Sequence, residues 1–311
     1  MAELTFSHLR KAYAATVASD DVSFDVRSGE VFGLLGPNGA GKSTLIRMLM
    51  DIIAPDAGEI LLDGHRLGPK DRDRIGYLPE ERGLYRKEKV IDVLIYFGML
   101  KGLVRAAARQ RALAWLDRVD LAAMAERRVD QMSKGQQQKV QIAGTLLHDP
   151  SILVVDEPFS GLDPMNTVLV RDLLQERSRA GCIVVLSTHQ MPLVEALCDR
   201  VAMIHQGRLV LYGPLEEIRR QDGEASVLVE ADGEIPTLDI AARSERQGPR
   251  VRIFLKPGAG PRDLMERMLR HGVPLQHFEV VRTPLEEIFV RTVRRLDAVP
   301  AESGALAGAR S

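Results

Sequence analysis

The 311-residue sequence has only two cysteines, Cys182 and Cys198, too few for a framework of several disulfides or a four-cysteine metal site. Its 42 basic and 43 acidic residues nearly cancel, which argues against a broad nucleic-acid-binding surface, since that needs a clustered basic excess. No run approaches the ~20 apolar residues that span a bilayer, and the N-terminus lacks the pattern of a signal peptide. The sequence therefore predicts a cytosolic chain that does not itself cross a membrane and does not bind nucleic acid.

The sequence does contain short apolar strands that alternate with helical patterns. Residues 3–10 and 21–27 alternate apolar and polar side chains, as half-buried antiparallel strands do. Three continuously apolar runs suit strands buried on both faces: VFGLLG (31–36), ILVVD (152–156) and CIVVLST (182–188). Helical patterns are expected at 41–53 and over 88–131. This order predicts an α/β fold with a parallel sheet and right-handed crossovers.

The composition changes near residues 221–225, where a linker is expected. Beyond it, strand and helix patterns over 225–297 predict a small α+β unit. Residues 298–311 have little to bury and are expected to be disordered. The expected domains are therefore 1–220, with a helical subdomain at about 86–147, and 225–297.

The segment GPNGAGKST (36–44) follows a buried strand and opens a helix, the context that the phosphate-binding pattern G-x-x-x-x-G-K-[ST] requires. Its glycines can adopt positive φ, so that backbone N–H groups face a phosphate. Lys42 is expected to contact the β- and γ-phosphates of ATP, and the Ser43 hydroxyl to ligate Mg²⁺. The predicted nucleotide contacts are Gly36, Pro37, Asn38, Gly39, Ala40, Gly41, Lys42, Ser43 and Thr44. The alternative is a glycine-rich turn at a helix start.

Carboxylates end the buried run ILVVDEP (152–158), at the strand end where ligands bind in parallel sheets. Asp156 is expected to hold Mg²⁺ through water, and Glu157 to orient or deprotonate an attacking water. His189 ends the next apolar run and is expected near the γ-phosphate, where it would stabilise transferring charge. The alternatives are two acids that only terminate a strand and a structural histidine.

Together with MSKGQQQKV (132–140), these motifs closely resemble those of the ATP-binding subunit of an ABC transporter over residues 2–217. The resemblance implies a P-loop ABC-type ATPase core with an antiparallel β-subdomain and a helical subdomain. It also implies that Ser133, Gly135 and Gln136 contact the γ-phosphate bound to a second subunit. A head-to-tail dimer around two ATP, formed by two copies or with a paralogous subunit, is therefore expected. Lys134 stands where the family most often has glycine.

Two further positions receive roles from the resemblance. Asp163, in SGLDP (160–164), matches the family's dimer-contacting loop and is also expected to cap its helix. Tyr13 falls where the family places an aromatic ring that stacks on adenine. Packing of the Tyr13 ring against the β-subdomain is the alternative.

In IGYLPEERGLY (75–85), Glu80 stands where the family usually has a glutamine that reaches Mg²⁺ and the attacking water. A carboxylate there would ligate Mg²⁺ more strongly than an amide. The spelling LPEERGLY is similar to the sodium- and drug-exporter branch. Glu80 is therefore predicted to be a metal ligand and catalytic residue, whereas Glu81 and Arg82 are expected in a solvated turn.

The segment TPLEEIFVRTV (283–293) resembles the accessory domain of exporters of drugs, sodium or lipids. The resemblance implies an ATP-hydrolysing subunit at the cytoplasmic face of the plasma membrane, bound to a separate integral-membrane permease. The alternatives are a soluble ABC-type ATPase that acts on DNA or ribosomes and a regulatory ATP-binding module. Soluble ATPases of this kind usually carry coiled coils, zinc-binding cysteines or a second ATP domain. Glu157 and His189 argue against a regulatory ATP-binding module. The permease would select the cargo.

Overall fold

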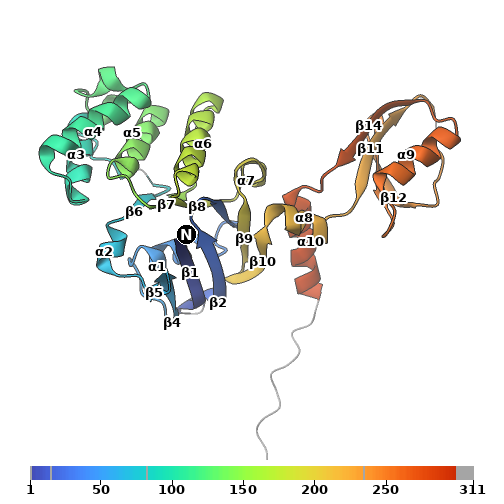
Figure 1. The fold of residues 1–311 in the computed structure, drawn as a ribbon, viewed down its shortest axis with the longest axis horizontal. Coiled ribbons are helices and arrows are strands. Elements are labelled where there is room, and N and C mark those ends of the chain that lie inside the picture. The colour runs from blue at the N-terminus through green and yellow to red at the C-terminus, as the bar shows by residue number, and fades with distance from the viewer. Residues whose placement is uncertain (1, 15, 82, 234, 299–311) are drawn as a thin grey trace, which may run out of the picture. The chain divides into compact units, whose positions relative to one another are not determined.

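The computed structural model describes residues 2–14, 16–81, 83–233 and 235–298 (Figure 1). Arg82, expected in a solvated turn, lies outside the described residues. Contacts divide the chain into two compact units, Met1–Leu215 and Glu216–Ser311. The division falls a few residues before the linker expected at 221–225, because helix α8 (Leu215–Asp222) groups mostly with the second unit. Within the described part of the chain, every helix is too short or too polar to cross a membrane.

The first unit is built on a six-stranded sheet in the order β10-β9-β3-β8-β7-β6. Its strands are β3 (Val31–Leu35), β6 (Ile75–Leu78), β7 (Ile152–Asp156), β8 (Ile183–Thr188), β9 (Arg200–His205) and β10 (Arg208–Pro214). All pairs are parallel except the β9–β10 hairpin. Every residue of β3, β7 and β8 is buried, which confirms the parallel core predicted from the three apolar runs.

A smaller antiparallel sheet, in the order β2-β1-β4-β5, packs on the central sheet. It comprises β1 (Glu3–Tyr13), β2 (Thr16–Arg27), β4 (Ala57–Leu62) and β5 (His65–Arg66). Phe24 of β2 stacks on Phe6 at a ring-centroid distance of 4.3 Å and on Phe32 of β3 at 5.3 Å. Helix α1 (Lys42–Leu49) contributes to the same core, so both sheets enclose one apolar interior.

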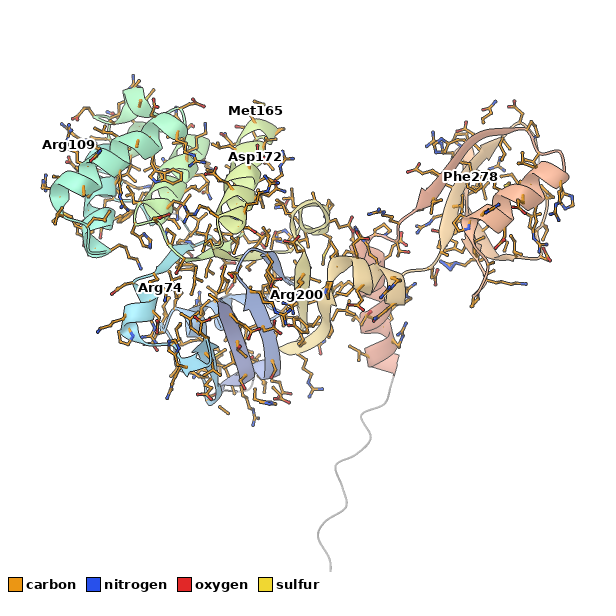
Figure 2. All side chains as sticks on the ribbon, in the orientation of Figure 1. Arg74, Arg109, Met165, Asp172, Arg200 and Phe278 are labelled. Carbon is orange, nitrogen blue, oxygen red and sulfur yellow. The ribbon has the colours of Figure 1, made fainter. Side chains whose placement is uncertain are left out.

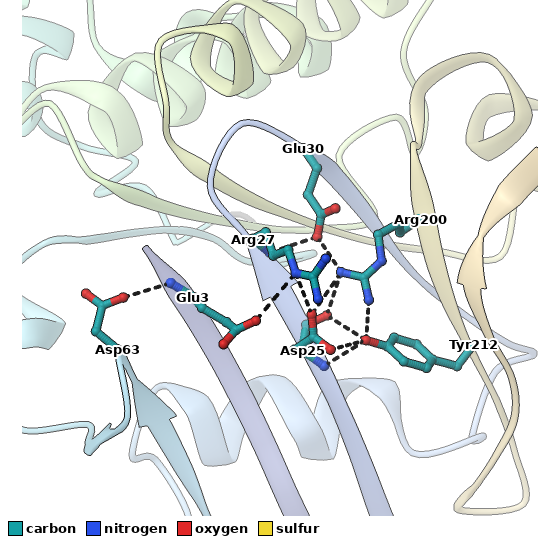
Figure 3. Close-up of polar contacts among 7 residues, drawn as sticks. All are labelled: Glu3, Asp25, Arg27, Glu30, Asp63, Arg200 and Tyr212. Carbon is teal, nitrogen blue, oxygen red and sulfur yellow. Dashed lines mark hydrogen bonds and ion pairs between the residues drawn. The ribbon is translucent and has the colours of Figure 1, made fainter. Parts of the chain in front are cut away.

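A polar network joins the two sheets at their edge (Figure 3). The Arg200 guanidinium of β9 donates to Asp25 of β2 at 3.0 Å and to Glu30 at 3.1 Å. The Tyr212 hydroxyl of β10 donates to Asp25 at 2.5 Å and accepts from Arg200. Partial burial opposes the charge of Asp25, but the hydrogen bonds from Tyr212 and Arg200 outweigh it and hold the pKa of Asp25 below its usual value.

A helical subdomain lies between β6 and β7 (Figure 1). It contains α3 (Val90–Leu100), α4 (Arg105–Arg118), α5 (Lys134–Leu146) and two single 3₁₀ turns (Ala122–Met124 and Val129–Gln131). These elements enclose a core of their own, which includes Val90, Leu94, Leu116 and Val140. The other helices of this unit are α2 (Pro69–Arg72), α6 (Pro164–Arg179) and α7 (Met191–Leu197).

The second unit is a four-stranded antiparallel sheet with helices, as the α+β prediction required. The sheet order is β12-β13-β11-β14. Its elements are β11 (Ser226–Ala231), β12 (Ala241–Gln247), β13 (Arg250–Leu255), α9 (Pro261–Arg270), β14 (Leu275–Val281) and α10 (Leu285–Ala298). Leu264 and Met268 of α9 pack on Val227 and Ile253. Of the expected tail 298–311, Ala298 ends α10 and residues 299–311 lie outside the described residues.

Candidate functional site

The loop between β3 and α1 has the backbone that its glycines predict. Gly36, Gly39 and Gly41 have φ values of 145°, 78° and 114°. A Cβ on Gly41 would lie 2.2 Å from the carbonyl oxygen of Ala18, and a Cβ on Gly36 would lie 2.2 Å from a neighbouring backbone oxygen. These positions therefore accept only glycine, and the loop is held against the backbone of β2. Ala18 was not predicted from the sequence, because it contributes through its backbone position, which has no chemical signature.

Lys42, the first residue of α1, points into this loop and is only 6% exposed. Its ammonium donates to the carbonyl oxygens of Gly36 at 2.7 Å and Pro37 at 3.2 Å. Burial lowers the pKa of Lys42, and the carboxylates of Glu157, Asp156 and Glu80 oppose that shift. The loop thus presents backbone N–H groups and one buried cation, a combination suited to phosphate.

One pocket brings together most of the predicted nucleotide and metal residues. Its lining comprises Ala18, Asn38, Gly39, Ala40, Gly41, Lys42, Ser43, Thr44, Glu80, Asp156 and Glu157. Gly36 and Pro37 do not line the pocket, but their carbonyl oxygens accept hydrogen bonds from the Lys42 ammonium. Strands β6 and β7 are parallel neighbours, with Leu78 opposite Val155. Glu80, two residues after Leu78, therefore lies at the same end of the sheet as Asp156. The contacts of Glu80 with the site therefore follow from strand pairing.

Asp156 is a buried carboxylate at the end of β7. Burial raises the pKa of Asp156, the negative charge of Glu157 adds to this, and the cations Lys42 and Arg47 oppose it. A carboxylate in such surroundings gains from a further positive charge, because a cation would offset the cost of its burial.

The donor set fits a magnesium ion shared with a nucleotide. The Ser43 hydroxyl and the carboxylates of Asp156 and Glu80 line one pocket, and oxygen is the ligand that Mg²⁺ prefers. In the described ranges, no three or more His, Cys, Asp or Glu side chains are grouped so as to hold a metal by themselves. For a Mg²⁺ ion here, the remaining ligands would be phosphate and water, as is usual for Mg²⁺ sites with one or two carboxylates.

Glu157 is held in a fixed orientation at the edge of the phosphate pocket. It is 7% exposed, and its φ of +47° is in the left-handed region that non-glycine residues seldom adopt. Its carboxylate accepts hydrogen bonds from the Thr188 hydroxyl at 2.9 Å and from the backbone N–H of His189 at 3.0 Å. The backbone N–H of Glu157 donates to Ser187 at 2.9 Å. Strand β8 thus fixes both the backbone and the side chain of Glu157, through a Thr188 contact that the sequence analysis missed.

His189 lies against Glu157 and does not line the phosphate pocket. Its Nδ1 is 2.7 Å from a carboxylate oxygen of Glu157, and its side chain is half exposed. Strands β7 and β8 are parallel neighbours, which brings the two side chains together. The immediate partner of His189 is therefore the carboxylate expected to act on water.

The residues Ser133, Gly135 and Gln136 lie at the start of α5 and do not line the phosphate pocket. The Ser133 hydroxyl accepts from the backbone N–H of Gln136 at 3.2 Å, and the Gln136 side chain accepts from the N–H of Ser133 at 2.9 Å. This capping box leaves Ser133 exposed at a helix N-terminus, where an anion is favoured. These residues are available to a ligand carried by another molecule.

Asp163 caps α6, as predicted, by accepting from the backbone N–H of Asn166 at 2.9 Å. The Asn166 side chain also donates to Asp163 at 2.6 Å. A Cβ on Gly135 would lie 3.1 Å from the amide nitrogen of the Asn166 side chain. The starts of α5 and α6 are therefore neighbours. Next to them Met165, labelled on α6 in Figure 2, is 80% exposed, which marks an apolar contribution to this surface.

Tyr13 ends β1 and is 44% exposed. Its ring lies 5.8 Å from the Lys11 ammonium, a cation–π contact, and it does not line the phosphate pocket. Exposure leaves part of the ring accessible for stacking, as the prediction for Tyr13 requires.

Comparisons with known proteins agree with the order of these motifs. A family profile described as "ABC transporter" matches residues 19–160, and one described as "ATP-binding protein DrrA1-3-like, C-terminal domain" matches residues 213–293. An uncharacterized ABC transporter ATP-binding protein of Bacillus subtilis, YhaQ, is 34% identical over 298 residues, which cover 93% of this chain and 98% of that protein. The Nod factor export ATP-binding protein I of Ralstonia nicotianae is 32% identical over 301 residues, 94% of each chain.

A solved structure titled as the ATP-binding subunit of an ABC transporter superposes with a TM-score of 0.66 at 35% identity. The match covers 71% of this chain and 93% of the solved one. The similarity in three dimensions thus spans a length close to that of the first compact unit, whereas the two sequence relatives extend over nearly the whole chain.

Proposed function

This chain belongs to the ATP-binding subunits of ABC transporters, in the DrrA-like exporter family, and we propose that it powers export through a separate integral-membrane permease. As an ABC transporter ATPase it binds ATP, and the proposal adds that two subunits close around two ATP molecules and reopen after hydrolysis. The observation that carries the proposal is the carboxylate of Glu157, held by β8 beside the pocket that Lys42 enters.

The charged and hydroxyl groups of the pocket have defined tasks in this proposal. The N–H groups of the loop and Lys42 bind the phosphates, while Ser43, Asp156 and Glu80 would hold Mg²⁺. When bound, Mg²⁺ would neutralise phosphate charge and polarise the γ-phosphoryl group. Glu157 orients the attacking water and accepts its proton. Thr188 and His189 keep the Glu157 carboxylate in place through the hydrogen bonds described above.

The replacement Glu157→Gln tests the proposed role. We expect it to lower the ATPase rate by about 10²-fold or more, the usual effect of losing a general base, while ATP binding persists. Glu59→Gln, which makes the same chemical change on exposed residue Glu59 of β4, is the matched control and should keep the parent rate. Equal rates in the parent and Glu157→Gln would reject Glu157 as the catalytic base.

The proposed dimer rests on where Ser133, Gly135 and Gln136 lie. They are outside the pocket of their own chain, and Ser133 is exposed beside the N-terminus of α5. A second subunit, another copy or a paralogue, would bring its ATP to this surface and to Asp163, and Tyr13 would stack on adenine. Light scattering of Glu157→Gln with ATP should report a mass twice that of the nucleotide-free protein. A mass that does not change with ATP would contradict the dimer of two copies.

Export and the membrane partner are supported by the relatives. The C-terminal profile names DrrA-like proteins, and the relative from Ralstonia nicotianae is named for Nod factor export. We propose an analogous location, at the cytoplasmic face of the plasma membrane through the permease, with a drug, sodium, a lipid or a similar substrate as cargo. Co-purification with a multi-span permease encoded beside the gene, together with stimulation of ATPase activity by that permease, is the expected result. If that permease neither co-purifies with this chain nor stimulates its ATPase activity, it is not the partner of this chain.

A further inference from the structure

The side chain of Gln141, in the middle of α5, lies against the loop that carries Glu80. Gln141 is 5% exposed. Its amide nitrogen donates to the carbonyl oxygen of Glu81 at 3.1 Å and, more weakly, to that of Pro79 at 3.4 Å. These two carbonyl groups belong to the residues before and after Glu80, so a single buried amide holds the backbone on both sides of the predicted metal ligand.

The orientation of the Gln141 amide follows from its surroundings. Turning the amide over would place its oxygen against two carbonyl oxygens, which cannot donate a hydrogen bond. The amide oxygen accepts no hydrogen bond from the residues that the structure describes. The side chain is therefore held through its donor atom, and its polar contacts serve the loop of Glu80.

Among the described residues of this loop, Pro79, Glu80 and Glu81 belong to no helix or strand. Strand β6 ends at Leu78, and α3 begins at Val90. Glu80 itself is exposed and has no hydrogen bond or ion pair within the described residues, yet it lines the phosphate pocket. Its position depends on what holds the neighbouring peptide groups, and Gln141 provides such a hold.

We propose that Gln141 is a positioning residue, whose amide sets the loop so that Glu80 faces the phosphate pocket and its metal. The proposal rests on the function assigned above to Glu80. Gln141 does not line the pocket and acts through the carbonyl groups of Pro79 and Glu81, the residues on either side of Glu80. Loss of the amide leaves two carbonyl groups without this donor and allows the loop to move.

Gln141→Met is the appropriate replacement, because methionine has a similar length and no polar atom that needs a partner. It also removes the buried amide oxygen that no described residue satisfies, so the folded state should tolerate it. Thr145→Val is the matched control. The Thr145 hydroxyl lies one turn along α5, donates to the backbone carbonyl oxygen of Gln141 at 2.9 Å and, more weakly, to that of Tyr77 in β6 at 3.4 Å, before the loop begins. Neither bond involves the side-chain amide of Gln141.

Two measurements test the proposal. In the nucleotide-free protein, cleavage after Glu80 and Glu81 by a glutamate-specific protease should be about 3- to 10-fold faster in Gln141→Met, the loss expected for one or two hydrogen bonds, and unchanged in Thr145→Val. The Mg²⁺ concentration that gives half-maximal ATPase activity should rise by about the same factor in Gln141→Met. Once Glu80→Gln is present, Gln141→Met should cause no further rise, because Gln141 acts through Glu80.

Unchanged cleavage after Glu80 and Glu81 would overturn the proposal, as would an equal shift in Mg²⁺ dependence with and without Glu80→Gln. If Gln141→Met does not fold, Gln141→Asn, which keeps an amide but is one methylene too short, carries the same expectations. An ATPase rate that Glu157→Gln leaves unchanged would reject the proposed catalytic base instead. In that case the cleavage measurement, made without nucleotide, still decides whether Gln141 holds the loop.

Discussion

His148 makes the stability of the first unit sensitive to mild acid. It follows α5, and both nitrogens of its ring are buried. Burial lowers the pKa of His148 to about 4, and the positive charge of Lys101 adds to the shift. Lys101 is itself held in place, because its ammonium donates to the carbonyl oxygens of Arg72 at 3.1 Å and Ile75 at 3.0 Å. The histidine therefore stays neutral in the fold at a pH where it is protonated in the unfolded chain.

The sign of the effect follows from proton binding. In the unfolded chain the pKa of histidine is about 6.5, so between pH 6.5 and 4 the unfolded state binds the additional proton and stability falls as the pH falls. At pH 5, which is about 1.5 units below the pKa of histidine in the unfolded chain, the loss of folding stability has an upper limit of about 2 kcal/mol. Because His148 is only partly buried, solvent screening reduces this, and we expect about 1 kcal/mol.

Urea unfolding at pH 7.5 and pH 5 measures this contribution. Trp115, the only tryptophan in the sequence, lies on α4 in the helical subdomain and reports on its unfolding by fluorescence. From pH 7.5 to 5, the free energy of unfolding should fall by about 1 kcal/mol less in His148→Leu than in the parent. An identical pH dependence in the two proteins would refute the reasoning, because the charge on His148 would then cost nothing in the fold.

Two further substitutions test other parts of the first unit. Gly41→Ala should abolish binding of a fluorescent ATP analogue, because φ is 114° and the new Cβ would lie 2.2 Å from the backbone of Ala18; parent-like affinity would contradict this. Tyr212→Phe should lower the free energy of unfolding by about 1 kcal/mol, since Asp25 loses a hydrogen-bond donor; an unchanged urea midpoint would show that the hydroxyl contributes nothing.

The central sheet could be predicted because its strands are buried on both faces. Continuous apolar runs are a strong signal, and β3, β7 and β8 match them closely. Strand β12 was missed: six of its seven residues are exposed, and the charged segment AARSERQ lies at a sheet edge. Such a strand is determined by pairing with β13, a long-range property that the local pattern does not carry.

The candidate site likewise contains residues that the sequence predicted and side-chain contacts that it did not. The phosphate loop is a contiguous motif, and strand pairing brings Glu80, Asp156 and Glu157 to it, as the sequence indicated. The contact of Thr188 with Glu157 depends on how two strands present their side chains. His189 was expected at the γ-phosphate, and its observed partner is Glu157, because β8 delivers the imidazole to the carboxylate of the adjacent strand.

Glu80, which is exposed, and Glu157, which is buried, both line the phosphate pocket but are held by different parts of the first unit. Glu157 is held by Thr188 and His189 at the end of a central strand, so it moves with the sheet. The loop of Glu80 is held by Gln141, so it follows α5 of the helical subdomain. Gln138 of α5 also reaches the carbonyl oxygen of Pro158, but at 3.4 Å this bond is weaker than the 3.1 Å bond to the loop of Glu80. The pocket thus has one carboxylate held by β8 and the residue that follows it, and one whose loop is held by α5, the helix that Ser133 begins.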